Sequence, residues 1–297
     1  MFDSKKVLVT GSSGFIGSHL VDSLNENCEE LICIDKNNRD GDLTDPKFVD
    51  TLPDVDIIFH MAARNGTRWF YEEPFTVLDN CSSPTLNLIK RYQNSKTLFI
   101  YASSCEIYAD ATEKGIIDVP TKEDISVLFE DPTNPRWSYA AGKYIGELAL
   151  MSAAIEFNMD YIILRYHNIY GPRQIDHFIP EFYSRLKSGD TSLKGWENTR
   201  SFCYISDAIE MTLRAARNPE SLNRVIHIGN DEEVTIKEVA EEILKISNIK
   251  ADIKLDSAPE GSVSRRCPDL SLAKKLGIYK KSISMNEGLE RTIEELK

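Results

Sequence analysis

The sequence lacks long apolar runs and an excess of positive charge. Its 297 residues contain no uninterrupted apolar run of about 18 residues, the length that crosses a bilayer. The opening segment MFDSKK also has no apolar signal core. We therefore expect a cytoplasmic protein with no membrane partner. The formal net charge of −12 repels phosphate backbones and no basic stripe offsets it, so we expect no nucleic-acid partner.

The sequence also lacks the residue spacings of a metal centre. Its six cysteines are scattered without a C-x-x-C pair, and its histidines show no metal-ligand spacing. This pattern fits reduced thiols better than disulfides or zinc ligands, so we expect no metal. The composition that remains, 41% apolar and 28% charged residues, is that of a globular chain with a large core.

Short apolar runs alternate with helical patterns through the first half of the chain. The runs KVLVT, ELICID, VDIIFH, TLFIYA and DYIILR predict strands, and helices are expected near 15–26, 74–93 and 137–157. This rhythm is typical of a doubly wound parallel sheet of the Rossmann type, in the α/β class. We expect residues 1–165 to form this domain, with some later segments returning to it. Shorter elements with Gly and Pro punctuation predict that residues 166–297 mainly form a smaller mixed substrate domain.

A glycine-rich turn follows the first predicted strand. The segment GSSGFIGSHL places Gly11, Gly14 and Gly17 at the entry to a helix, where the backbone can approach a pyrophosphate. The second strand ends at Asp35, about where a carboxylate bonds the adenosine ribose and repels a 2′-phosphate. The sequence therefore favours NAD over NADP, although two basic residues that follow Asp35 weaken the preference. Further cofactor candidates are Phe15, Ile16, Asp42, Leu43, Ala62 and Ala63.

The segment SYAAGKY places Tyr139 and Lys143 four residues apart, on one face of a predicted helix. A tyrosine has a pKa of about 10 in water. A neighbouring ammonium and a nicotinamide cation would stabilise the phenolate and bring this pKa closer to working pH. Because the pair follows a dinucleotide loop, we interpret Tyr139 as a general base, and both residues as cofactor contacts.

Taken together, these motifs resemble those of the extended short-chain dehydrogenase/reductases that modify nucleotide sugars. The resemblance covers nearly the whole chain and is carried by GSSGFIG, HMAA, DNCSSPTLNLI, SSCEIY, YAAGK, RYHNIYGPR, TRSFCYISD, IHIGND and RRCPD. It implies a retained NAD, a nucleotide-diphosphate sugar (a UDP-, GDP-, dTDP- or CDP-hexose) as substrate, and a homodimer paired through the helices near 74–93 and 137–157. The motifs are specific for the family and poorly specific for the reaction.

The resemblance implies a shared opening step that yields a transient 4-keto sugar. Tyr139 would take the proton of the sugar's 4-hydroxyl, and Ser104 would hydrogen-bond that oxygen. Lys143 would hold the ribose and lower the pKa of Tyr139 while hydride passes to the nicotinamide. Other implied contacts are Asn80 for the cofactor, Asn168, Arg200 and Arg266 for the nucleotide diphosphate, and Arg68 and His177 near the hexose.

The segment SSCEIY bears on what the 4-keto sugar is used for. A ketone at C4 acidifies the hydrogen on C5, so a carboxylate there could act as the base for elimination or inversion. Glu106 occupies a position where both the 4,6-dehydratases and the UDP-glucuronate decarboxylases of the family carry glutamate. Cys105 departs from the Asp or Ser that usually precedes it in the dehydratases. We rank dehydratase-type C5 chemistry first, with Glu106 as base and Cys105 beside it, then 4-epimerisation, then decarboxylation.

Two other classes remain open. An extended dehydrogenase of the steroid or flavonoid type would consume free NADPH or NADP and needs an apolar pocket, and Asp35, Arg200 and Arg266 argue against it. A non-catalytic NAD-sensing protein commonly loses the tyrosine or the lysine, and this chain has both Tyr139 and Lys143.

Overall fold

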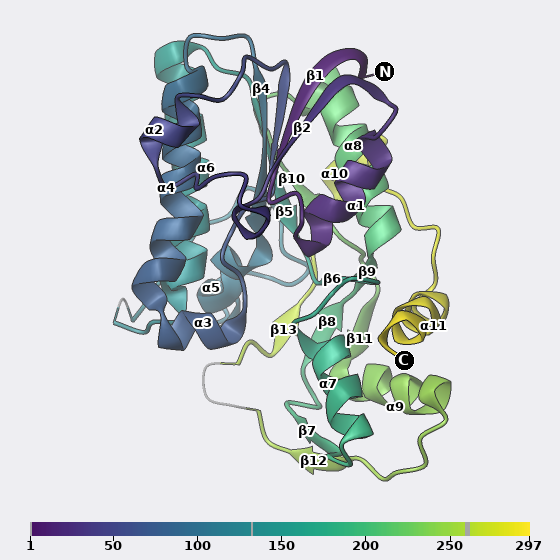
Figure 1. Cartoon of the computed structure of the whole chain (residues 1–297). Helices are drawn as coiled ribbons and strands as arrows, with labels where there is room; N and C mark the ends of the chain where they lie inside the picture. Colours follow the sequence, from purple (N-terminus) through teal and green to yellow (C-terminus); the bar gives the residue numbers. More distant parts are fainter. Residues whose placement is uncertain (1, 132, 259–261) are drawn as a thin grey trace.

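The structure, a computed structural model, describes residues 2–131, 133–258 and 262–297. Its centre is a six-stranded sheet with strand order β10-β5-β4-β3-β1-β2 (Figure 1), and every pair of neighbours is parallel. The strands are β1 (Phe2–Thr10), β2 (Cys28–Ile34), β3 (Ile57–His60), β4 (Leu98–Ser104), β5 (Tyr161–Tyr166) and β10 (Arg224–Ile228). The expected α/β class with a doubly wound parallel sheet is confirmed.

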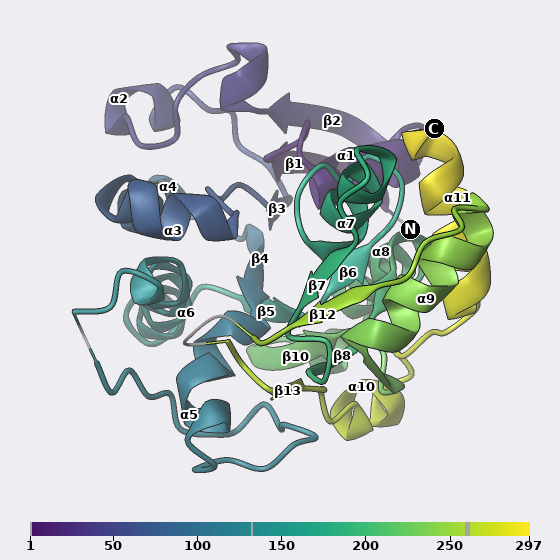
Figure 2. The ribbon, with the colours of Figure 1, turned by 90° about the horizontal axis from the view of Figure 1, so that it is seen from below.

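Helices cover both faces of this sheet, which explains why its central strands are almost entirely apolar. All residues of β3 and β5 are buried, as expected for strands that are covered on both sides. Ile162 and Ile163 point to opposite faces, because side chains alternate along a strand, and each joins a different core cluster. The helices α4 and α6 lie on one face, and α1 and α8 lie on the other (Figures 1 and 2).

The three helices expected near 15–26, 74–93 and 137–157 are present as α1, α4 and α6, with bounds within two residues of the prediction. The helices of the sheet domain are α1 (Phe15–Leu24), α2 (Pro46–Val49), α3 (Thr67–Glu72), α4 (Pro74–Tyr92), α5 (Ala109–Glu113), α6 (Trp137–Phe157), α8 (Ile205–Arg217) and α10 (Ser271–Lys275). The long α4 and α6 pack side by side along one face of the sheet (Figure 2).

A smaller lobe lies beyond the carboxyl ends of the sheet strands (Figure 1). Its helices and strands are α7 (Phe178–Lys187), α9 (Ile236–Ser247), α11 (Met285–Leu296), β6 (Ile169–Tyr170), β7 (Ser192–Lys194), β8 (Thr199–Ser201), β9 (Cys203–Tyr204), β11 (Glu233–Thr235), β12 (Lys254–Asp256) and β13 (Arg265–Arg266). Although it comes late in the chain, β10 lies in the main sheet beside β5. The division of the chain near residue 166 stays a prediction.

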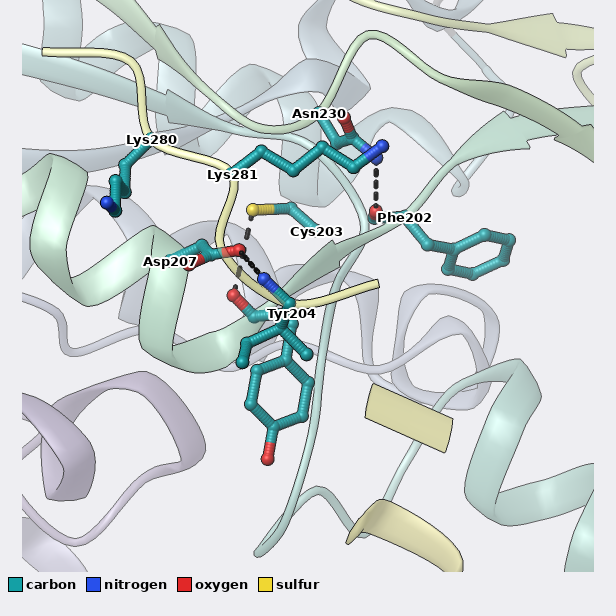
Figure 3. Close-up of a pocket in the computed structure, with 8 residues that line it drawn as sticks. Phe202, Cys203, Tyr204, Asp207, Asn230, Lys280 and Lys281 are labelled. Atoms are coloured by element: carbon teal, nitrogen blue, oxygen red, sulfur yellow. Dashed lines mark hydrogen bonds between the residues drawn. The ribbon is translucent and has the colours of Figure 1, made fainter. Parts of the chain in front are cut away.

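Hydrogen bonds connect the C-terminal segment to the start of α8. The carboxylate of Asp207 accepts hydrogen bonds from the backbone nitrogens of Ser282 and Ile283, at 2.9 and 3.1 Å. Nearby, the side chain of Asn230 donates to the carbonyl of Phe202 at 3.2 Å (Figure 3). Asp207 and Asn230 line a small pocket, and their hydrogen bonds to backbone groups hold these segments of the fold together.

Across the described ranges, we find no helix long and apolar enough to span a bilayer.

Candidate active site

The loop between β1 and α1 is built around glycines that nothing larger could replace. Gly11 has a φ of +68°, and a Cβ on it would lie 2.7 Å from the backbone nitrogen of Ala62. A Cβ on Gly17 would lie 2.0 Å from the carbonyl oxygen of Gly11. The bare backbone therefore turns tightly into the N-terminus of α1, which is the arrangement that accommodates a pyrophosphate.

Asp35 stands next to this loop at the end of β2. It is largely buried, and its two carboxylate oxygens accept hydrogen bonds from the backbone nitrogens of Ser13, at 3.0 Å, and Asn37, at 2.9 Å. These bonds fix the carboxylate against the glycine loop, where it would meet a ribose bound there. The loop and the acid together fit the adenosine half of NAD.

The other expected cofactor residues occupy varied settings. Phe15 and Ile16 form the first turn of α1, and Leu43 is buried. Ala62 contacts the glycine loop, whereas Ala63 is exposed. Asp42 pairs with Lys36 at 2.5 Å, and Asn80 donates to the carbonyl of Thr76 at 2.9 Å on α4.

Ser104 and Tyr139 meet at the carboxyl end of β4. Ser104 is the last residue of that strand, and its Oγ accepts a hydrogen bond from the backbone of Glu106 at 3.2 Å. It also hydrogen-bonds with Tyr139, whose ring is buried and stacks on Phe70 with centroids 5.1 Å apart. Burial raises the pKa of Tyr139 above its usual value, and the Ser104 bond only partly offsets this. In the protein alone the phenol is therefore neutral at working pH.

Lys143 lies one helical turn beyond Tyr139 and is buried. Its Nζ donates to the carbonyl of Ala102 at 2.7 Å and lies 4.9 Å from the centre of the Tyr101 ring. Burial lowers the pKa of Lys143 to about 8. The lysine is thus anchored to the strand that ends in Ser104. That it lowers the pKa of Tyr139 stays a prediction for the cofactor-bound state.

Two arginines from different segments pair with Glu106, and the charge of a third, Arg200, also lowers its pKa. Arg266, on β13, donates from Nη1 to the Glu106 carboxylate at 2.8 Å, and Nη2 of Arg136 lies 3.6 Å from its other oxygen. Arg200, on β8, stands opposite Arg266 in the register of the two strands. Burial alone would raise the pKa of Glu106, but Arg266 and Arg136 outweigh it and the pKa is lowered. Burial and the charge of Arg266 lower the pKa of Arg200 to about 9.

Cys105 is buried between the serine and the glutamate. Burial raises the pKa of its thiol, although the nearby charge of Arg266 acts in the opposite direction. Its side chain also hydrogen-bonds with Arg266. Cys105 is therefore a neutral thiol packed against the arginine cluster.

The other expected substrate residues lie in three separate settings. Asn168 donates to the carbonyl of Ser201 beside Arg200, at 3.0 Å. Arg68 is exposed and pairs with Glu72 one turn along α3, at 2.8 Å. His177 is exposed, and its ring lies 3.3 Å from the side-chain nitrogen of Asn65. The structure thus places Asn168 beside the arginine cluster, while Arg68 and His177 face other partners.

The sequence reasoning missed two residues of this site. Arg136, the residue immediately before α6, pairs with Glu106, and the ring of Phe70 stacks on that of Tyr139. A signal for Arg136 was present, because it precedes Tyr139 by three residues and so shares a helix face with it. No local pattern marks Phe70, which comes from α3.

A buried ion pair lies behind the site. Glu147, on α6, accepts from Nε of Arg165 at 2.8 Å and from its Nη2 at 2.6 Å. It also accepts from Ser103, the neighbour of the catalytic candidate Ser104, at 2.5 Å. Arg165 extends from β5 and donates to the hydroxyl of Tyr108 as well. These bonds connect α6 with β4 and β5 directly beneath the Ser104 and Tyr139 pair.

A glycine loop, an acid after the second strand and a serine, tyrosine and lysine on a parallel sheet define a short-chain dehydrogenase/reductase of the extended kind. Sequence comparison narrows this class: the chain belongs to the NAD dependent epimerase/dehydratase family, whose sequence model matches residues 7–229. NAD is therefore its cofactor, and the chain is an NAD-dependent enzyme acting on nucleotide sugars.

Relatives of two activities match along the whole chain. A UDP-N-acetyl-α-D-glucosaminuronate decarboxylase of Bacillus cytotoxicus is 28% identical over 98% of this chain and 97% of its own. A putative UDP-glucose 4-epimerase of Methanocaldococcus jannaschii is 30% identical, with 98% of both chains covered. The solved UDP-glucose 4-epimerase of Thermotoga maritima, with UDP-glucose, superposes with a TM-score of 0.85 at 27% identity and covers 98% of both chains.

Replacing Asp35 should weaken NAD binding. We expect Asp35→Ala to raise the dissociation constant of NAD by about 10- to 100-fold, because a charge-assisted bond to the ribose is lost. Titration of cofactor-free protein with NAD and NADP would measure this. The Asp54→Ala variant changes an exposed aspartate and should bind NAD normally. A wild-type preference for NADP would contradict this role of Asp35.

Proposed function

We propose that the chain removes CO₂ from a UDP-linked uronic acid after transient oxidation at C4. The observation that carries this proposal is the surplus of positive charge at Glu106, which pairs with two arginines and interacts electrostatically with a third. A uronic acid would supply negative charge at C6 in addition to its diphosphate. The Bacillus cytotoxicus relative, a decarboxylase of such a substrate by name, supports the same choice.

The proposed chemistry requires no strong base at C5. Bound NAD would supply the hydride acceptor at C4 and later return the hydride. Tyr139 would take the proton of the 4-hydroxyl and, as a phenol again, donate a hydrogen bond together with Ser104 to the C4 oxygen. A ketone at C4 stands β to the C6 carboxylate, so the C5–C6 bond breaks, its electron pair forms an enolate at C4, and CO₂ leaves. A solvent-derived proton then adds at C5.

The contacts of Glu106 favour this reaction over the dehydration that the sequence ranks first. A carboxylate whose pKa is lowered by two guanidinium groups is a weaker base. The neutral Cys105 thiol, with its raised pKa, is also a poor proton donor for a leaving hydroxyl. We propose that Glu106 instead holds Arg136 and Arg266 in place around the substrate.

The reaction can be read from product masses in D₂O. We expect NAD-loaded protein to remove about 44 mass units from UDP-glucuronate or UDP-N-acetylglucosaminuronate and to place one deuterium at C5. UDP-glucose should remain unchanged. A loss of about 18 mass units from a neutral hexose would restore the dehydratase interpretation with Glu106 as base.

Plain 4-epimerisation is the second candidate, because the Methanocaldococcus and Thermotoga relatives carry that name. It predicts an inverted product of unchanged mass with no solvent deuterium, since the only carbon-bound hydrogen that moves leaves C4 and returns to it. Such a product in the same D₂O assay would replace the decarboxylase proposal. Tight NAD retention with no turnover of any nucleotide sugar would indicate a sensor.

We also propose that a second copy of the chain covers α4 and α6. Leu86 on α4, and Leu148 and Ile155 on α6, are exposed apolar residues on the two helices that pack side by side. We expect light scattering to give twice the monomer mass and Leu148→Glu to lower it. A wild-type mass that stays monomeric at all concentrations would contradict this.

The free cysteines are consistent with a cytoplasmic location, which we propose as well.

A further inference from the structure

The arginines around Glu106 approach it from two sides. Arg200 and Arg266 belong to neighbouring strands of the small lobe, next to Asn168 and its partner Ser201. Arg136 comes from the sheet domain, at the residue that precedes α6. The pair on the strands is therefore one unit, and Arg136 is a separate positive charge at the other oxygen of the carboxylate.

Arg136 is also less fully bonded than Arg266. Arg266 makes a direct hydrogen bond to Glu106 at 2.8 Å, whereas the nearest nitrogen of Arg136 stays 3.6 Å from the carboxylate. Both arginines are 13% exposed and have a buried Nε without a hydrogen-bond partner, so they differ in their terminal nitrogens, of which those of Arg136 make no direct hydrogen bond to Glu106. A buried guanidinium with an unused donor is unfavourable unless an anion completes its bonding. Its planar, forked donors match a carboxylate best.

The position of Arg136 also fits one particular carboxylate. It precedes Tyr139 by three residues, and residues at that spacing on a helix have Cβ atoms about 5–6 Å apart on the same face. Tyr139 acts on the oxygen at C4 of the sugar. C4 has two neighbouring ring carbons, C3 with a hydroxyl and C5 with the C6 group. In a uronic acid only the C6 group carries a charge, so it is the partner that a guanidinium one turn before Tyr139 would favour.

We propose that Arg136 binds the C6 carboxylate of the substrate and thereby selects uronic acids over neutral hexoses. The proposal rests on the proposed function, since it names the residue that reads the substrate's acid. Arg200 and Arg266 then remain for the diphosphate, which uronic and neutral sugar nucleotides share. Arg136 pairs with the carboxylate from binding until CO₂ leaves, and the loss of CO₂ takes negative charge away from it, so Arg136 contributes to substrate binding and does not accelerate CO₂ loss.

Binding measurements on NAD-loaded protein test this without turnover of the neutral ligand. The Tyr139→Phe variant, which should not convert the acid, is titrated calorimetrically with UDP-glucose and with UDP-glucuronate. The ratio of the two affinities gives the preference for the acid. We expect the Tyr139→Phe protein to prefer UDP-glucuronate, and Arg136→Gln to weaken that binding by about 10- to 100-fold. The affinity for UDP-glucose should be unchanged. Arg214→Gln, at a half-buried arginine paired with Glu210 on α8, should alter neither affinity.

Kinetics separate this role from a merely structural one. With Tyr139 intact, Arg136→Gln should raise KM for the uronic acid while kcat stays within about threefold. Arg136→Lys keeps the charge without the fork and should show an intermediate KM; it also serves if the glutamine variant does not fold. An unchanged preference between the two ligands, or an equal loss of affinity for both, would overturn the assignment. Absence of CO₂ release by the wild-type protein would instead overturn the proposed function.

Discussion

Replacing Tyr139 with phenylalanine is expected to lower kcat by about 100- to 10,000-fold, because the group that exchanges the proton at the C4 oxygen is removed. The phenylalanine ring keeps the stacking contact with Phe70. Binding of NAD and of the nucleotide sugar should therefore persist, and titration of both ligands into the variant would show it.

A matched control is available in the same helix. Tyr144, on α6, packs against the apolar cluster of Cys105, Ile107, Tyr108 and Ala140. Tyr144→Phe keeps this apolar contact and should retain nearly full activity. Turnover by Tyr139→Phe above about one percent of the wild-type rate would mean that another group is the base.

The second large effect concerns stability. Removing the carboxylate of Glu147 leaves the buried Arg165 guanidinium without its partner, since the exposed fractions of the two side chains are only 0% and 4%. We expect Glu147→Ala to lower the free energy of unfolding by about 3–5 kcal/mol. Urea denaturation followed by circular dichroism would measure the loss.

Two companion variants show whether the unpaired charge is responsible. The double variant Glu147→Met with Arg165→Met removes both charges and should recover much of the stability, because similar apolar side chains can replace a buried pair. Glu210→Ala removes a partly solvent-exposed pair with Arg214 and should change stability by less than about 1 kcal/mol. If Glu147→Ala proves as mild as Glu210→Ala, the buried pair does not hold these strands and α6 together.

The parts of the molecule that the sequence predicted well are those governed by local rules. The apolar runs became β1 to β5 in order, because strands of a covered parallel sheet must be apolar on both faces. The glycine spacing predicted the loop after β1 for a similar reason, since Gly11 and Gly17 leave no room for a side chain. The lysine four residues beyond Tyr139 likewise lies on the same helix and is buried with it.

The parts that the sequence did not predict depend on tertiary contacts. Glu106, Arg136 and Arg266 meet only after three distant segments are folded, so no spacing along the chain could indicate their ion pairs. Arg68 pairs with a residue four positions away on the same helix, and its contact with the hexose stays a prediction. A nearby arginine was an alternative partner for Glu106 from the sequence, but which arginines it meets depends on the fold, and its role as a base stays a prediction.

The register of β8 and β13 places Arg200 directly opposite Arg266, and like charges in that arrangement repel each other. A diphosphate bound between them would offset that repulsion, so the nucleotide would stabilise the three-stranded sheet that contains β8 and β13. Binding and lobe stability are then thermodynamically linked, and each increases the other. In this proposal the nucleotide half of the substrate helps to build the surface that recognises it, which would give substrates that carry a diphosphate an advantage over free sugars before any chemistry begins.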